Sequence, residues 1–133
     1  MKRLMMAILF IGALMMVSSG FAMAGVTGET KIQKAVVVFD EPIKLLNVVL
    51  KGQYLFVHDE ELMAQGKACT YVYNYTDGKQ GDLVVSFHCI PVAREKSSQF
   101  AVTVSLQAGT NLYELTEYRF AGSTEGHRVP QAK

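Results

Sequence analysis

The stretch that decides the fold is residues 68–92, which read ACTYVYNYTDGKQGDLVVSFHCIPV. Two runs rich in Val, Tyr, Phe and Thr enclose the short polar segment 77–81, which is the pattern of a β-hairpin. Folding the chain about Lys79 places Cys69 opposite Cys89. In that register one face is mostly polar and the other is apolar and aromatic, so register and burial agree. The apolar face carries Cys69, Tyr71, Tyr73, Tyr75, Leu83, Val85, Phe87 and Cys89.

Cys69 and Cys89 are the only cysteines of the chain. Directly opposed residues at a non-hydrogen-bonded site have Cα atoms about 4.5 Å apart, at the short end of disulfide geometry. The sequence therefore predicts a structural disulfide between them, and closing such a loop adds roughly 3 kcal/mol to the free energy of unfolding. The alternatives are two free thiols, or thiolates that bind a soft metal ion.

We expect the unfolded, unreduced protein to show no titratable thiol, because both sulfurs are held in the bridge. A thiol titration in denaturant measures this, and the same titration after reduction is the control. Free thiols on both cysteines before reduction would contradict the predicted bridge.

Residues 1–24 have the pattern of a cleavable secretory signal peptide. A positively charged start precedes an uncharged run over residues 4–17, and Ala22 and Ala24 are the small residues that suit a signal peptidase. The uncharged run is shorter than the roughly 20 residues of a membrane-spanning helix. We therefore expect export to the periplasm or the exterior, cleavage near Ala24, and a single mature domain over residues 25–133 without a transmembrane segment.

The expected mature chain is close to electrically neutral. Of the 13 Lys and Arg residues two precede the cleavage site, which leaves 11 against 12 Asp and Glu and a formal net charge of −1. This balance gives no basic stripe for nucleic acid and no polybasic cluster for an anionic membrane surface. The partner classes that stay open are another protein and a small apolar ligand.

The rest of the mature chain has mostly the two-residue hydrophobic period of β-strands. Pro42 is expected to separate two strands, because it lacks a backbone donor, and Gly52 is expected to link two others. The strands are expected at residues 31–39, 43–50, 53–58, 68–76, 82–92, 98–108 and 111–120.

Two segments depart from this β pattern. Residues 59–66 predict a short helical turn, with Asp59 as its N-cap and Gly66 at its end. Residues 121–133 predict an irregular tail, either packed as an ordered arm or free. About seven short strands with hairpin spacing predict an all-β fold, a small antiparallel sandwich or barrel.

Three histidines, His58, His88 and His127, are candidate metal ligands. Histidine with a thioether suits copper and histidine with a carboxylate suits zinc, so Met63 and Asp59 complete the candidate set. No HxxH or CxxC spacing supports a metal site. The alternative is three unrelated histidines at strand ends or on the surface, with Met63 packing the helical turn onto the core.

The sequence gives little support for catalysis. Asp82, Ser86 and His88 project from one face of one expected strand, but residues two apart on a strand are too distant and too parallel to pair a nucleophile with its base. His88 and Cys89 point to opposite faces and cannot form a Cys–His pair. We therefore assign no catalytic residue.

Four stretches belong together: YLFVHD at 54–59, MAQG to CT over 63–70, VSFHC at 85–89, and EYRFAG to His127 over 117–127. Together they resemble small exported bacterial proteins of uncharacterised function. The resemblance implies no activity, cofactor or partner. The four stretches contain His58, Cys69, Cys89 and His127.

The leading hypothesis is therefore an exported, non-enzymatic β domain that binds a partner or supports the cell envelope. The second hypothesis is a periplasmic copper- or zinc-binding protein that uses the histidines, and the third is an enzyme of unknown class. Bound metal, co-purifying lipid or protein, and turnover would separate the three.

Overall fold

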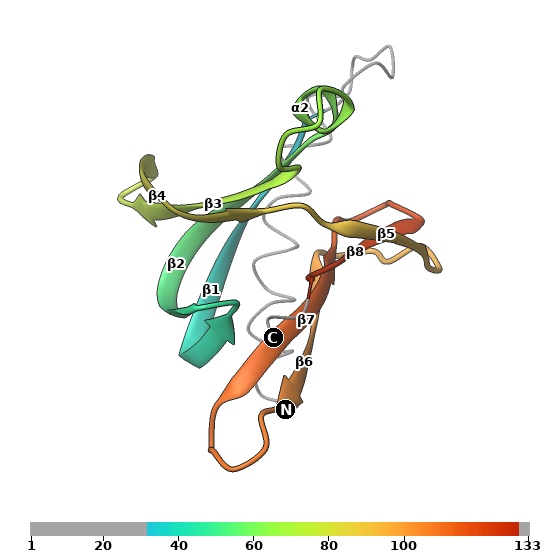
Figure 1. Ribbon diagram of the computed structural model, residues 1–133. Helices are drawn as coiled ribbons and strands as arrows, with labels where there is room; N and C mark the ends of the chain where they lie inside the picture. Colours follow the sequence, from blue (N-terminus) through green and yellow to red (C-terminus); the bar gives the residue numbers. More distant parts are fainter. Residues whose placement is uncertain (1–31, 131–133) are drawn as a thin grey trace.

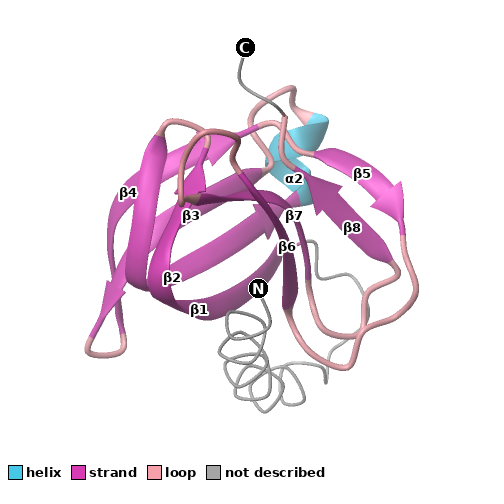
Figure 2. Ribbon diagram, turned by 90° about the horizontal axis from the view of Figure 1, so that it is seen from below, coloured by secondary structure: helices cyan, strands magenta, loops and turns pink. Residues whose placement is uncertain are grey.

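The computed structural model describes residues 32–130, and its regular structure is β-strand apart from one short helix (Figure 2). The expected signal peptide, residues 1–24, lies outside the described residues. Within residues 32–130 no helix is both long and apolar enough to cross a membrane. The predicted all-β class with one short helical turn is confirmed.

Figure 1 labels the strands and the helix of the described residues. The strands are β1 (Ile32–Leu45), β2 (Val48–Asp59), β3 (Thr70–Thr76), β4 (Lys79–Phe87), β5 (Ile90–Ala93), β6 (Ala101–Leu106), β7 (Tyr113–Arg119) and β8 (Glu125–Arg128), and the helix is α2 (Glu60–Ala64).

The eight strands form one sheet in the order β4-β3-β2-β1-β7-β8-β5, with β6 paired to β7. Strands β1–β4, the first group, lie on one side of the molecule, and β5–β8, the second group, lie on the other (Figure 1). A short parallel ladder joins the groups through the pairs Ile43–Tyr113 and Lys44–Glu114. No described ladder joins β4 to β5, so the sheet is not closed into a barrel, and the arrangement is consistent with a sandwich.

Aromatic side chains fill the core between the two groups. The ring of Phe56 on β2 lies 5.8 Å from that of Phe100, next to β6, and 5.4 Å from that of Tyr118 on β7, centroid to centroid. All three side chains are fully buried. Edge-on aromatic pairs add to the stabilisation from burial, so these contacts hold the groups together away from the short β1–β7 ladder.

The expected breaks at Pro42 and Gly52 are wrong. β1 continues past Pro42 through a register shift between Phe39 and Ile43, where the proline needs no ladder hydrogen bond. β2 likewise continues through Gly52, whose φ of 99° suits a bulge. The chain reverses instead after Leu45, where Leu46 has a φ of 55°.

The β3–β4 hairpin turns more tightly than the predicted loop 77–81. Asp77 and Gly78 alone form the turn, with φ values of 53° and 75°, as in a type I′ turn, and Thr76 pairs with Lys79. Two further register shifts follow along the ladder, so no pair keeps the predicted register about Lys79.

The shifted register also places the tyrosines of β3 differently. Tyr71, Tyr73 and Tyr75 lie on the outer face, where they pack against a small cluster of buried aliphatic side chains, Val36, Leu55 and Val57. Val72 and Thr70 are fully buried instead, paired with Val85 and Phe87. A shift of one residue exchanges the faces of a strand, so the predicted face of β3 is wrong. The predicted face of β4 is right at Val85 and Phe87, which pack in the core, and wrong at Leu83, which is 50% exposed.

Two other segments differ from the prediction in strand content. The expected strand 82–92 is divided, because β4 ends at Phe87 and β5 begins in the second group. The expected irregular tail contains β8, which pairs with β5 and with the end of β7. A strand of four residues is too short to show a clear period. The expected strands 98–108 and 111–120 correspond to β6 and β7.

The predicted helical turn is confirmed. The Asp59 carboxylate accepts hydrogen bonds from the backbone N–H groups of Glu61 and Leu62, at 3.0 and 3.1 Å, and so caps α2. Gly66 follows the helix with a φ of 85°.

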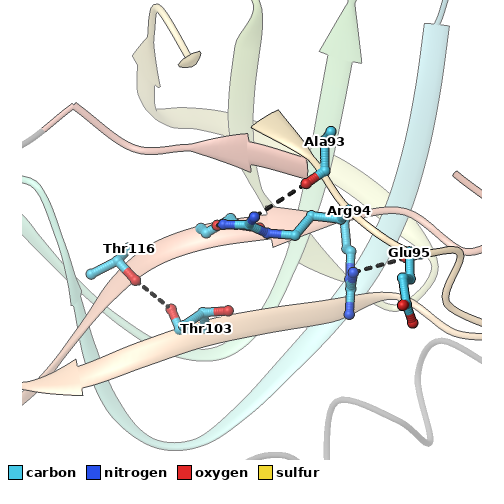
Figure 3. A network of polar contacts seen from close by, with 7 residues as sticks. Ala93, Arg94, Glu95, Thr103 and Thr116 are labelled. Carbon is cyan, nitrogen blue, oxygen red and sulfur yellow. Dashed lines mark hydrogen bonds and ion pairs between the residues drawn. The ribbon is translucent and has the colours of Figure 1, made fainter. Parts of the chain in front are cut away.

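An ion pair covers strand β8. The Arg94 guanidinium donates two hydrogen bonds to the Glu117 carboxylate, at 2.8 and 2.7 Å. It donates a third, at 3.1 Å, to the carbonyl of Ala93 (Figure 3). The hydrogen bonds from Arg94 lower the pKa of Glu117. A Cβ placed on Gly126 would lie 2.5 Å from Glu117 Oε2 and 3.1 Å from Arg94 Cγ, so a side chain at 126 must displace the pair.

We expect Gly126→Ala to lower the free energy of unfolding by about 1–3 kcal/mol, because it overpacks the space under the ion pair. Denaturant unfolding of the variant and the wild type measures the difference. In a Glu117→Ala background the same substitution should cost less, because the nearest clash is gone. An equal cost in both backgrounds would show that the ion pair does not constrain this glycine.

Candidate functional site

Four side chains from distant parts of the chain meet where the two strand groups approach each other without a ladder. His58 lies near the end of β2 and Cys69 immediately precedes β3, both in the first group. Cys89 lies in the link between β4 and β5, and His127 belongs to β8 of the second group. We call these four residues the His–Cys cluster.

The cysteines of the His–Cys cluster form the predicted disulfide. Their Sγ atoms are 2.09 Å apart and their Cα atoms 6.1 Å apart. The bridge lies beyond the last ladder pair of the hairpin, Thr70–Phe87, where β3 has not yet begun and β4 has ended. The disulfide therefore links the start of β3, in the first group, covalently to the segment that connects β4 with β5 of the second group.

The two histidines of the cluster stack on each other inside the protein. Their ring centroids are 4.0 Å apart with 30° between the planes, and each residue is 1% exposed. The ring of Tyr118 lies 5.0 Å from that of His127 and forms part of their surroundings. His58 is positioned by its pairing with Thr70, and His127 by its pairings with Pro91 and Tyr118.

Most ring nitrogens of these two histidines lack a hydrogen-bond partner. Both nitrogens of His58 and Nε2 of His127 are buried without a hydrogen-bond partner among the described residues. Nδ1 of His127 has a weak contact of 3.8 Å with Cys89 Sγ. A buried polar group without a partner costs about 1–3 kcal/mol, so a group of them in a native protein calls for a functional explanation.

Burial keeps both imidazoles neutral near neutral pH. It lowers the pKa of His127 to about 4, with a smaller contribution from nearby His58 and an opposing one from Glu117. Burial also lowers the pKa of His58, against the opposing effect of Glu60 and Asp59. The neutral imidazole is the form that binds metal ions.

Two hydrogen-bond donors and one acceptor, the carbonyl oxygen of Phe87 at 3.8 Å, lie near the sulfur of Cys69. The backbone N–H of Cys89 donates to Cys69 Sγ at 2.9 Å, and the hydroxyl of Thr70 lies 3.7 Å from the same sulfur. The Thr70 hydroxyl is itself hydrogen-bonded to the hydroxyl of Tyr118 at 2.5 Å. Burial raises the pKa of Tyr118, so its phenol stays protonated and can act as a donor.

The spacing of the ligand atoms matches a metal site only in part. One ligand atom each of His58, Cys69 and Cys89 lies within 4.8 Å of the others, and His127 adjoins Cys89. The two sulfurs are bonded to each other, however, and metals bind thiolates rather than disulfides. The cluster therefore contains the residue types of a Cys₂His₂ zinc site, but its sulfurs are oxidised and only His58 meets the spacing with both of them.

Of the five expected metal ligands, the structure brings together His58 and His127. His88 is exposed, although it is adjacent to Cys89 in sequence. Met63 is 40% exposed on α2, and the carboxylate of Asp59 is occupied as the cap of that helix. Neither His88 nor Asp59 belongs to the group of close histidine, cysteine and carboxylate ligand atoms found among the described residues.

The sequence did not predict that the cysteines and histidines form one cluster. A signal was present in the short connection between His58 and Cys69, which flank the capped turn 59–66. If β2 and β3 pair as neighbours, His58 must lie opposite Thr70 and beside Cys69. The approach of His127 had no such local signal.

Comparison with protein-family models gives no match, and no similar curated protein or solved structure is found. The site is therefore interpreted from its own geometry.

We expect the chelator-treated, metal-free protein to lose stability as the pH falls from 6.5 towards 4. A histidine in the unfolded chain binds its proton near pH 6.5, whereas folded His127 binds it only near pH 4, so the unfolded state takes up more protons between these values. The contribution of this residue, about 3 kcal/mol, is complete above pH 6.5 and is lost across that window.

Unfolding free energies measured from pH 8 to pH 4 test this expectation. His127→Phe should flatten the profile, because the buried ring no longer titrates. His88→Gln, at an exposed site, should leave it unchanged. A His127→Phe profile as steep as that of the wild type would assign the pH dependence to other groups.

Proposed function

We propose that this chain is an exported, non-enzymatic β domain that binds a soft transition-metal ion, Cu(I) or Zn(II), in the reduced state of the His–Cys cluster. His58, His127, Cys69 and Cys89 would be the ligands. The observation that carries the proposal is the buried histidine pair, whose ring nitrogens have almost no protein partners. One ring nitrogen of His58 lies within 4.8 Å of both cysteine sulfurs, and His127 Nδ1 lies 3.8 Å from Cys89 Sγ. The N-terminal pattern and the disulfide support export.

The chemistry of the donors selects the metal. Thiolate and imidazole are ligands for zinc and copper, whereas magnesium and calcium require oxygen. A ligand set of two cysteines and two histidines is typical of structural zinc sites, and Cu(I) prefers soft sulfur ligands. Binding such an ion would give one nitrogen of each imidazole a partner, including one of the two unpartnered nitrogens of His58.

Metal binding requires two local movements. Reduction must first break the Cys69–Cys89 disulfide, because two thiolates on a tetrahedral ion with Zn–S bonds of about 2.3 Å lie about 3.8 Å apart and share no bond. At least one imidazole must also turn. The lone pair of an imidazole lies in the plane of its ring, and the two rings face each other with only 30° between their planes, so their lone pairs do not point to a common metal position. Both are side-chain rearrangements within a site whose backbone positions are set by β2, β3 and β8.

We expect the reduced, folded protein to bind one Co(II) ion, a spectroscopic substitute for zinc, with the thiolate-to-metal absorption of a tetrahedral sulfur–nitrogen site. His58→Phe and His127→Phe should each weaken binding by at least about tenfold, since replacing even a supporting residue of a metal site costs that much. Absorption titrations under anaerobic conditions, with competition by Zn(II), measure this. Elemental analysis of protein isolated without chelator gives the natural metal.

His88→Ala is the matched control, because His88 is a histidine next to Cys89 that is exposed and outside the cluster. It should bind cobalt like the wild type. Reduced protein that keeps its β circular dichroism but takes up neither cobalt, zinc nor Cu(I) would overturn the proposal. The leading sequence-based hypothesis, a structural or partner-binding module, would then be preferred.

A further inference from the structure

The two cysteines of the disulfide differ in their exposure to solvent. Cys69 is fully buried, whereas Cys89 is half-buried in the link that crosses between the strand groups. The residues on either side of Cys89 are both exposed: His88, and Ile90 at 45%. A thiol that approaches from solution therefore meets Cys89 first.

The two sulfurs also differ in their hydrogen-bond surroundings. Cys69 Sγ accepts a hydrogen bond of 2.9 Å from the backbone N–H of Cys89 and lies 3.7 Å from the hydroxyl of Thr70, which is bonded in turn to Tyr118. The carbonyl oxygen of Phe87, an acceptor, lies 3.8 Å from the same sulfur, so the short N–H bond is the main stabilising contact. The one polar contact that the structure describes for Cys89 Sγ is with His127 Nδ1 at 3.8 Å, and no donor lies as close to it as the 2.9 Å N–H lies to Cys69 Sγ. Donors that point at a sulfur stabilise the thiolate, and a stabilised thiolate is a better leaving group in thiol–disulfide exchange.

We infer that the Cys69–Cys89 bond is a gate for the metal site, and that an external dithiol opens it by attacking Cys89 and expelling Cys69. Access and leaving-group stabilisation both select this direction of attack. The inference rests on the proposed metal-binding function for its biological purpose, but the chemistry of the exchange can be tested without a metal. The partner it requires is a dithiol reductant in the exported compartment.

The exchange balances in two steps. The attacking thiolate forms a new S–S bond to Cys89 Sγ while the Cys69–Cys89 bond breaks, and the electron pair leaves on Cys69 as a thiolate. The second thiolate of the reductant then attacks its own sulfur in the mixed disulfide and releases Cys89. The reductant is oxidised to its disulfide, and its two protons pass through solvent to the protein thiols, which release them again when a metal binds.

Metal binding and the disulfide exclude each other, because both use the same electron pairs of Cys69 and Cys89. A bound ion would hold the sulfurs apart, and oxidation to the disulfide would expel the ion. The redox state of the compartment would therefore set how much metal this domain retains.

The direction of attack can be tested with glutathione, a small thiol that can be trapped on the protein. The purified oxidised protein is treated with glutathione, quenched with an alkylating reagent in denaturant, and mapped by peptide mass spectrometry. We expect glutathione on Cys89 and the alkyl group on Cys69. Glutathione mainly on Cys69, or equally on both, would overturn the inferred direction.

Two variants test the role of the hydroxyl pair. Thr70→Val removes the hydroxyl next to Cys69 and should slow the exchange about tenfold, the effect of losing one hydrogen bond to a charged group. Tyr118→Phe breaks the same Thr70–Tyr118 hydrogen bond but leaves the Thr70 hydroxyl free to donate to Cys69, so its rate should stay close to that of the wild type. Equal slowing in both variants would show that the effect is structural and would contradict the leaving-group role.

The outcomes distinguish this inference from the proposed function. Glutathione on Cys89 together with no metal uptake by the reduced protein would retain the directed exchange and refute metal binding. Metal uptake by the reduced protein with exchange at Cys69 would retain metal binding and refute the inferred gate. If Thr70→Val or Tyr118→Phe fails to fold, the mapping of the wild type still decides the direction.

Discussion

An open sheet must hold its two sets of strands together with something other than a continuous ladder, and this constraint shapes the protein. The only described ladder between the first and second groups is the short one from β1 to β7, which consists of two residue pairs. Aromatic packing around Phe56 and Tyr118 joins the groups in the core. Beyond it the Cys69–Cys89 bond secures the link that carries the chain from one group to the other.

The same location has features that reduce stability. Three ring nitrogens of His58 and His127 are buried without partners among the described residues, and burial disfavours the charged form of both rings. Apolar residues of similar size would fill this space without those costs. Departures from the usual rules of packing and polar satisfaction concentrate at functional sites in natural proteins. The His–Cys cluster is therefore more readily understood as a site for chemistry than as part of the core.

The sequence predicted the disulfide correctly, although the register used to argue for it was wrong. The turn at Asp77 and Gly78 and the register shifts beyond it change every pair of the ladder. The prediction for the cysteines still holds because they lie beyond the last pair, where the chain leaves the sheet and the ladder no longer sets their distance. Bulges are not visible in a two-residue hydrophobic period, so the period could not reveal which face of β3 is buried.

The sequence by itself determined the features that depend on near neighbours along the chain. The two-residue period predicted the β class, and Asp59 and Gly66 predicted the short helix. The presence of only two cysteines, in a chain whose first residues have the pattern of a signal peptide, predicted the disulfide. Only the tertiary structure decided that His58 meets His127, that His88 stays exposed, and that the expected tail adds a strand. The physical reason is that the contact between His58 and His127 results from β2 and β8 packing across the core. No local spacing encodes a contact between strands so far apart in the sequence.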